Sequence, residues 1–455
     1  MWREGAVLTF RHFHGSRERG VSTRETASRE LPTGSAVRMD SEPPSPDKSS
    51  ACPFCGLLCD DLQIAFEGAR ATAARNACPK ATQALAAVMA SAKPSINGKA
   101  VALDDALEAA AGVLRKAQRP LLAGLGTDVA GMRAALALGE RCGALLDHLH
   151  GVAMGRQLRV LQSRGLTLTT LSEVRNRADL VLLLGVDLNA DFQRFAATCL
   201  APEETLAPAH RQRRTVFHLG PKGTAPRDCP VPVTALPCPP GQLLEVFDVL
   251  RALASGRSAR AAARTLRTLQ PLLEAMASAA YTVVAWAPGQ LPADSADLLI
   301  ASACELVAEI NKTRRAAGLS LGGNDGGQSA LACSAWITGY PLPVSYAGEV
   351  LEHDPLRFET RRLLAAGEID ALLWLSSFSD RAPPQTALPR IVLGTAGTAR
   401  PAANAICIPT GTPGIDHAGQ LIRTDGVVAL PVQALVDRKL PSSASVLDAL
   451  RTRMD

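Results

Sequence analysis

Residues 180–185 read LVLLLG, an almost uninterrupted run of large apolar side chains that ends in glycine. A strand with one face in water alternates apolar and polar residues, whereas a strand buried on both faces is apolar throughout. Both faces of a sheet are buried when helices cover each of them, as is usual for parallel sheets. The run therefore predicts an α/β fold built on a parallel sheet.

The sequence before this run alternates between helical and apolar segments. Residues 104–117 and 132–142 have the apolar spacing of helices, and each is followed by a short apolar run, at 120–125 and at 144–147. Helix and strand in regular succession are typical of a doubly wound parallel sheet. We therefore predict that residues 99–240 form a first doubly wound α/β lobe.

A second α/β lobe is predicted over residues 241–430. It begins with a long helical region at 242–278. A glycine-rich loop, GGNDGG at 322–327, lies between its later strands. The glycines of this loop allow backbone conformations that are closed to other residues. The remaining elements expected in this lobe are strands at 282–287, 371–375 and 390–394 and a helix at 296–311. We expect residues 431–455 to form a C-terminal helix.

Two shorter regions precede the lobes. Residues 1–50 are rich in polar and charged side chains, so we predict a disordered tail and linker there, with a start codon assigned too early or a targeting peptide as the alternatives. Residues 51–98 are predicted to form a small cysteine-bearing domain. It contains a strand at 62–66 and a helix at 79–92 that opens with proline, a residue favoured at the first helical position.

Composition excludes several classes of protein. The net charge of +5 is small for 455 residues, and basic runs with interleaved aromatic residues are missing, which disfavours a nucleic-acid surface. Apolar runs are all shorter than the roughly 18 residues that a membrane-spanning helix needs. Eleven cysteines without a secretory signal indicate reduced thiols. We therefore expect a cytoplasmic protein that binds neither nucleic acid nor a membrane.

Four of the eleven cysteines are grouped. Cys52, Cys55 and Cys59 lie in one glycine-containing loop, and Cys78 directly precedes the proline of the predicted helix. Four thiolates spaced in this way can converge on one metal centre. Structural zinc sites usually use two CxxC pairs, one on each side of a long gap. The bunching of three cysteines therefore favours a 4Fe-4S cluster, with a zinc site or a metal-free site as alternatives.

The cysteine motif also carries a resemblance to a known family. Residues 51–61, ACPFCGLLCDD, together with NACP at 76–79, are similar to the cluster domain in the B subunit of formylmethanofuran dehydrogenase, within the molybdopterin oxidoreductase superfamily. The resemblance continues in EVRNRAD at 173–179, TGYP at 338–341 and GQLIRTD at 419–425. It implies a small N-terminal Fe-S domain followed by doubly wound parallel-sheet lobes of the molybdopterin oxidoreductase type, with a 4Fe-4S cluster on the four cysteines.

The resemblance also implies places for a second cofactor. Active relatives hold a molybdenum or tungsten ion between two pterin guanine dinucleotides, whose phosphates lie in loops that follow strands. On this chain the matching positions assign Gly185, Asn189, Lys222 and Asn324 to cofactor binding. Glycines in such loops allow the backbone to approach a phosphate closely, and a lysine adds positive charge.

The expected ligand of that metal is missing from the sequence. Active relatives use a cysteine or selenocysteine in a short loop, and we place Ala153 at the matching position. An alanine side chain has no lone pair to give to a metal, so we expect no catalytic residue here and no molybdenum or tungsten. His148, His150 and Met154 are the alternative ligands that this loop offers.

The family occurs in two functional settings. One is redox chemistry on formylmethanofuran, and the other is a bacterial complex that transfers a formyl group to a methanofuran analogue and hydrolyses it to formate. The alanine favours the second setting, so we expect a non-redox scaffold that binds the hydrolase and transferase subunits in one-carbon metabolism. The alternatives are an active component of a molybdenum- or tungsten-containing formylmethanofuran dehydrogenase and a stand-alone iron-sulfur protein.

Overall fold

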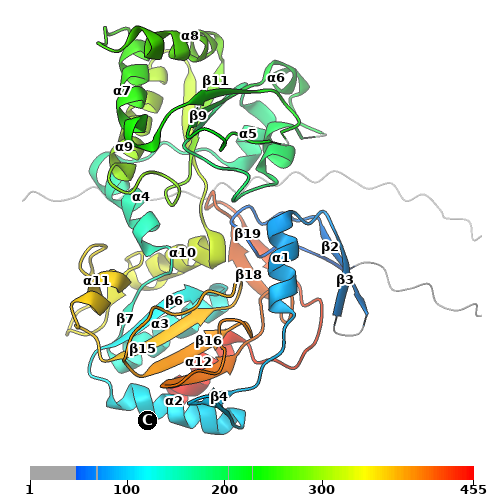
Figure 1. Ribbon diagram of the computed structural model, residues 1–455, viewed down its shortest axis with the longest axis vertical. Helices are drawn as coiled ribbons and strands as arrows, with labels where there is room; N and C mark the ends of the chain where they lie inside the picture. The colour runs from blue at the N-terminus through cyan, green and yellow to red at the C-terminus, as the bar shows by residue number, and fades with distance from the viewer. Residues whose placement is uncertain (1–47, 68–69, 203, 228, 455) are drawn as a thin grey trace, which may run out of the picture. The chain divides into compact units, whose positions relative to one another are not determined.

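The computed structural model describes residues 48–67, 70–202, 204–227 and 229–454. It shows a mixed α/β fold with two large sheets whose central strands are parallel (Figure 1). A three-stranded and a two-stranded antiparallel sheet accompany them. The prediction of an α/β fold with parallel sheets is confirmed.

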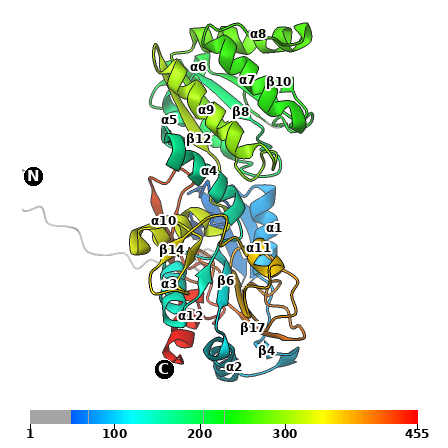
Figure 2. The same ribbon diagram turned by 90° about the vertical axis from the view of Figure 1, so that its left-hand side faces the viewer.

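The five-stranded sheet is parallel throughout and has the strand order β10-β9-β8-β11-β12. Its central strand β8 (Leu180–Leu184) is the apolar run that predicted the fold, and all of its residues are buried. Helices α7, α8 and α9 pack together beside this sheet (Figure 2) and share a core with it. The elements of this region besides β8 are α4 (Gly151–Arg164), α5 (Leu171–Arg177), the helical turn η1 (Ala196–Leu200), α6 (Pro208–Arg213), β9 (Thr215–Gly220), β10 (Val233–Pro237), η2 (Pro240–Gln242), α7 (Leu243–Ala254), α8 (Ala263–Ser278), β11 (Tyr281–Trp286), α9 (Ala296–Ile310) and β12 (Arg315–Ser320).

The nine-stranded sheet has the order β14-β13-β7-β6-β15-β16-β17-β4-β5, and the five strands from β7 to β17 in this order are parallel. Strands β6 (Pro120–Gly126) and β15 (Ala371–Ser376) are buried along their whole length. Helices α2, α3 and α12 pack together and complete its core. The other elements of this region are β4 (Ser95–Ile96), β5 (Lys99–Ala100), α2 (Leu103–Lys116), α3 (Val129–Cys142), β7 (Leu145–Leu146), η3 (Asn324–Gly326), α10 (Gly327–Thr338), β13 (Val344–Ser345), β14 (Glu352–His353), α11 (Thr360–Ala365), β16 (Arg390–Gly394), β17 (Ala405–Pro409) and α12 (Ser443–Thr452).

The small sheets frame the cysteine segment. The three-stranded sheet consists of β1 (Lys48–Ser50), β2 (Leu62–Glu67) and β3 (Arg70–Arg75), and helix α1 (Pro79–Val88) follows it. The linker predicted up to residue 50 therefore ends in a strand, while the predicted tail before residue 48 lies outside the described residues. The two-stranded sheet pairs β18 (Gly419–Ile422) with β19 (Ala429–Val432).

The predicted boundary at residue 240 implied that one large sheet is complete before the other begins. The structure differs, because the chain enters the nine-stranded sheet, builds the five-stranded sheet and then returns. Strands β6 and β7 of the predicted first lobe belong to the nine-stranded sheet, whereas β8, β9 and β10 belong to the five-stranded sheet. The chain then completes the five-stranded sheet with β11 and β12 and returns to the nine-stranded sheet at β13. Sequence patterns identify strands but not their partners, because pairing between distant segments leaves no local signal.

Two of the predicted helical regions, 242–278 and 431–455, have bounds that were too long. Residues 242–278 contain two helices, since α7 ends at Ala254 and α8 begins at Ala263, and Gly256 between them has a positive φ of 70°. Helix α12 covers only part of the predicted 431–455. In the described part of the chain, we find no helix long and apolar enough to cross a membrane.

Candidate functional site

A cavity of about 230 Å³ lies at the carboxyl ends of the five-stranded sheet. The chain leaves β8 toward one edge of this sheet and later returns to its other side with β11. Open α/β sheets bind their ligands in the crevice at such a switch point. The segments 287–290 after β11 and 320–324 around the end of β12 line the cavity, and helix α4 supplies further lining residues. The cavity therefore lies where a doubly wound sheet is expected to hold a ligand.

Ala153, the expected metal-ligand position, lines this cavity. It lies in the first turn of α4 rather than in the loop that the sequence suggested. A β-carbon added to Gly289 would lie 3.7 Å from Cβ of Ala153, so the methyl group points at the turn after β11. His150 and Met154 also line the cavity, whereas His148 does not. The described residues of the lining include no cysteine.

A buried carboxylate, Asp325, holds the two histidines that precede α4. Its Oδ2 lies 2.9 Å from Nε2 of His150, and its backbone carbonyl lies 3.2 Å from Nε2 of His148. The backbone N–H of His150 donates to Nδ1 of His148, which leaves the proton of His148 on Nε2. Ser379 donates to Oδ1 of Asp325 at 2.6 Å. Both carboxylate oxygens of Asp325 and both ring nitrogens of His148 thus have defined partners.

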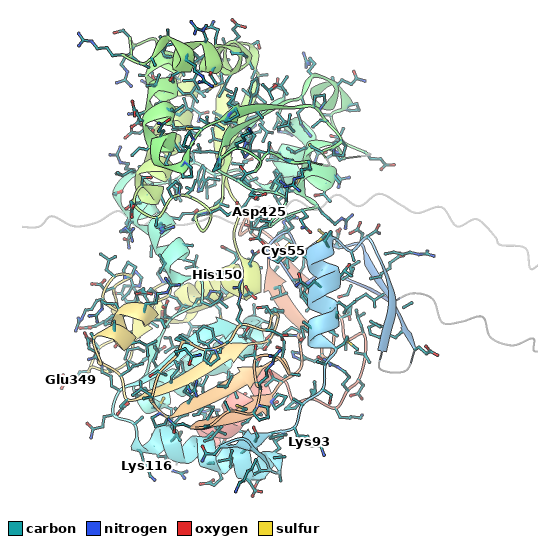
Figure 3. The ribbon with its side chains drawn as sticks, viewed as in Figure 1. Cys55, Lys93, Lys116, His150, Glu349 and Asp425 are labelled. Atoms are coloured by element: carbon teal, nitrogen blue, oxygen red, sulfur yellow. The ribbon has the colours of Figure 1, made fainter. Side chains whose placement is uncertain are left out.

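The protonation states of the cluster follow from burial and charge. Burial alone would raise the pKa of Asp325, but the hydrogen bonds from His150 and Ser379 lower it to about 2. Burial, and then the neighbouring His150, lowers the pKa of His148 to about 3. Near neutral pH, Asp325 is therefore ionised and His148 is neutral. Figure 3 labels His150, which lies at the cavity.

Of the four residues assigned to cofactor binding, Asn324 lines this cavity, and Gly185, Asn189 and Lys222 are not among its lining residues. The side-chain amide of Asn189 is hydrogen-bonded to the backbone of its own region, as donor to one carbonyl and acceptor from one N–H. Gly185 has a positive φ of 64° and directly follows β8, which fits an ordinary tight turn. The structure therefore brings one of these four residues to Ala153 and leaves three apart from it.

The four grouped cysteines line a second, small cavity. Cys52 and Cys55 are buried, and Cys59 and Cys78 are partly buried. The backbone N–H of Cys52 donates to the carbonyl of Cys59 at 2.7 Å and closes the loop. Cys78 caps α1, because its Sγ accepts from the backbone N–H of Ala81 at 3.4 Å. Figure 3 labels Cys55 in this region. The structure thus brings all four side chains to one place.

Burial keeps the thiols of Cys52, Cys55 and Cys59 protonated unless positive charge is added. Burial, and then the neighbouring Cys59, raises the pKa of Cys55 to about 12. Burial raises the pKa of Cys59 to about 11, although the charge of Arg194 lowers it. A bound metal supplies the missing charge and removes the protons. Within the described ranges, we find no three His, Cys, Asp or Glu side chains arranged to hold a single ion. In a 4Fe-4S cluster each thiolate binds a different iron, which requires wider sulfur spacing than one zinc ion.

The other wall of the four-cysteine cavity comes from residues that the sequence analysis missed. Phe192, Gln193 and Arg194 follow β8 of the five-stranded sheet and line this cavity together with Lys80. Phe192 also lines the cavity at Ala153, so it separates the two. A basic residue after a strand is ordinary in turns, and only the tertiary fold brings it to the cysteines. The sequence carried no local signal for this wall.

Comparison with known proteins gave relatives that include two B subunits and one solved structure, and no family model matches the chain. The chain is 31% identical over 366 residues to the B subunit of the formyltransferase/hydrolase complex Fhc of Methylorubrum extorquens, and the match covers 79% of this chain and 97% of that protein. It is 24% identical over 433 residues to the B subunit of the tungsten-containing formylmethanofuran dehydrogenase 2 of Methanococcus maripaludis, with coverage of 90% and 98%. Among solved structures it is similar to a chain of the formyltransferase/hydrolase complex FhcABCD from Methylorubrum extorquens in complex with methylofuran, with a TM-score of 0.67, 30% identity and coverage of 79% and 98%.

Proposed function

Since the chain belongs to the family formed by the B subunits of formylmethanofuran dehydrogenases and formyltransferase/hydrolase complexes, we propose that it is the B subunit of a formyltransferase/hydrolase complex in one-carbon metabolism. The observation that carries this proposal is the match over 97% of the length of the bacterial relative at 31% identity. On this proposal the partners are the hydrolase and transferase subunits, and the chain is their non-redox scaffold. The cytoplasmic location remains a proposal from the sequence.

The chemistry at Ala153 supports the non-redox role. The residues around it do not fit a molybdenum- or tungsten-pterin group, because Ala153 has no donor atom for the metal and the described lining includes no cysteine. Ligand pockets for drug-sized molecules measure roughly 300–1,000 Å³. A cavity of about 230 Å³ is smaller than those, and two pterin guanine dinucleotides are larger than a drug-sized molecule.

The four-cysteine cavity fits an iron-sulfur cluster by its donor set. Cys52, Cys55, Cys59 and Cys78 would hold a 4Fe-4S cluster, with zinc as the runner-up. Such a cluster, when bound, can carry one electron and can also tie the loop to α1. The chain's own contribution is to gather the four thiols in one cavity, two of them buried, and to place Cys78 at the positive end of a helix. These features support the cluster part of the proposal.

A second candidate function is that of an active oxidoreductase component with an unusual metal ligand. The match to the tungsten-containing relative covers 90% of this chain, more than the match to the bacterial relative, and this favours keeping the candidate. His150 and Met154 line the cavity and have lone pairs. Of these, His150 already binds Asp325 through Nε2, which leaves Nδ1 as its remaining nitrogen.

The test is co-expression of this chain with its hydrolase and transferase subunits. The proposal predicts a stable complex that releases formate from a formylated methanofuran analogue and does not reduce a redox dye. A control preparation without this chain should lose assembly and most formate release. Dye reduction by the complex, with stoichiometric molybdenum or tungsten, would establish the oxidoreductase instead. A chain that co-purifies with neither of these partners would contradict both functions.

A further inference from the structure

Two cationic side chains line the four-cysteine cavity, and the carboxylates that pair with them do not. Arg194 and Lys80 are lining residues, while their partners Asp61 and Asp191 are not. Each ion pair is therefore turned with its positive end toward the thiols. Lys80 belongs to the cysteine segment itself, two residues after Cys78, whereas Arg194 comes from the turn after β8 of the five-stranded sheet.

The Arg194 pair is attached to both halves of the cysteine segment. Two guanidinium nitrogens of Arg194 donate to the two carboxylate oxygens of Asp61, one of them at 2.7 Å. Asp61 follows Cys59 by two residues, and its backbone carbonyl accepts from Nδ2 of Asn76 at 2.9 Å. Asn76 precedes Cys78 by two residues. Arg194 thus binds Asp61, the residue through which the loop of three cysteines is hydrogen-bonded to the segment before Cys78.

The positive charge of Arg194 beside the four-cysteine cavity would stabilise a bound cluster. Four thiolates around a cluster core give an anionic centre, and a fixed cation nearby stabilises it, most strongly where water is excluded. Only 21% of the Arg194 side chain is exposed. The fork of an arginine also fixes direction, because it binds a carboxylate through two parallel hydrogen bonds that a lysine cannot make.

We infer that Arg194 is a positioning residue of the four-cysteine centre, which fixes the cysteine loop through Asp61 and presents a positive charge to the bound metal. The five-stranded sheet therefore takes part in building a centre whose ligands all come from the N-terminal segment. The inference deepens the proposed function and rests on it only for the identity of the centre as an iron-sulfur cluster.

The experiment compares three full-length variants with the wild type. Arg194→Gln removes the charge and the fork, and Arg194→Lys keeps the charge alone. Arg357→Gln is the matched control, since Arg357 forms an exposed ion pair with Glu352 at 3.0 Å, and neither residue lines the four-cysteine cavity. Hydrogen exchange of residues 52–61 is measured on the metal-free chains. Iron content and the midpoint potential of the cluster are measured after anaerobic reconstitution with iron and sulfide.

We expect exchange at residues 52–61 to be about fivefold faster in both Arg194 variants and unchanged in the control, as loss of a charge-assisted hydrogen bond requires. In the reconstituted chains, the potential should become more negative in Arg194→Gln and stay closer to wild type in Arg194→Lys. Unchanged exchange in the metal-free Arg194 variants would overturn the inference. An unchanged potential in Arg194→Gln would likewise overturn its electrostatic part. If the wild type takes up no iron, the cluster assignment fails, and the exchange comparison still decides whether Arg194 positions the loop.

Discussion

The two cavities of this protein share Phe192 as a wall and differ in which metal-donor atoms and which backbone surroundings they contain. Around Ala153 the frame is present: a switch point of a parallel sheet, and a loop in which Asp325 and Gly326 have φ of 52° and 70°. The donor atom expected there is missing. At the cysteines all four donors are present, but part of the frame comes from another sheet. A similar fold therefore does not carry similar chemistry, which depends on single donor atoms.

The largest expected effect is at the donors that the four-cysteine cavity has kept. Cys55→Ala should abolish iron binding, because one thiolate fewer leaves one iron of the cluster without its protein ligand. Cys333→Ala is the control, since Cys333 is buried in the core and apart from the cavity. Iron per chain and visible absorbance after reconstitution measure the effect. Equal iron in the two variants would show that the grouped cysteines hold no centre.

A second variant tests whether the two cavities are built on one another. Gly56 donates to Oδ1 of Asn324 at 3.2 Å and so joins the cysteine loop to the lining of the other cavity. A β-carbon at Gly56 would lie 1.8 Å from the backbone oxygen of Gly322, which cannot move aside easily. Gly56→Ala should therefore lower the free energy of unfolding by about 3 kcal/mol or more.

The control for this variant is Gly241→Ala, because an added β-carbon there meets no atom of the described residues within 4 Å. Chemical denaturation of both variants gives the comparison. A Gly56→Ala protein as stable as the control would mean that the two segments are not in contact.

The frame of the Ala153 cavity should have a pH signature. Burial raises the pKa of Asp147, which precedes His148, to about 6, although Thr360 donates two hydrogen bonds to its Oδ2. Its Oδ1 has no hydrogen-bond partner among the residues that the structure describes. The pKa of Asp147 is higher in the folded than in the unfolded protein. The contribution of this carboxyl to the free energy of unfolding is therefore fully present below about pH 4 and is lost as the pH rises through about 6. Up to about 3 kcal/mol is lost in this window.

Asp147→Asn should remove this loss. The difference in unfolding free energy between wild type and variant, followed from pH 4 to pH 7, isolates the contribution of this carboxyl from that of the other titrating groups. Parallel curves would show that Asp147 does not have a raised pKa.

The smallest expected effect is at the missing donor itself. Ala153→Cys restores one sulfur, but activity also needs the metal, two pterins and a path for electrons. We therefore expect no dye reduction and unchanged formate release by the assembled complex. Both assays are run side by side on wild type and variant complexes. A variant that gained molybdenum or tungsten and reduced the dye would mean that the cavity kept more than its frame.

The sequence predicted local elements well. The apolar run at 180–185, the strand at 390–394 and the proline start of α1 have a local physical cause, and each lies where it was expected. The four cysteines could be grouped because three of them share one loop. Helix α4 was missed because its first turn has the short, glycine-containing pattern of a loop.

What the sequence could not predict depends on distant pairing. Strand β15 pairs with β6, although all strands of the five-stranded sheet lie between them in the sequence. This pairing leaves no local signal, so the predicted lobe boundary at residue 240 did not separate the sheets. For the same reason, Arg194 could not be assigned to the cysteines: its partner Asp61 is far away in the sequence. Site walls that are made by tertiary contacts need a structure.

Metal analysis of the purified chain tests the central contrast most directly. Iron, zinc, molybdenum and tungsten are measured together on protein isolated without oxygen, in complex with its partners and alone. Our account predicts about four irons per chain, with molybdenum and tungsten at background. Stoichiometric molybdenum or tungsten would contradict the non-redox role, and a chain with neither iron nor zinc would contradict the four-cysteine metal centre.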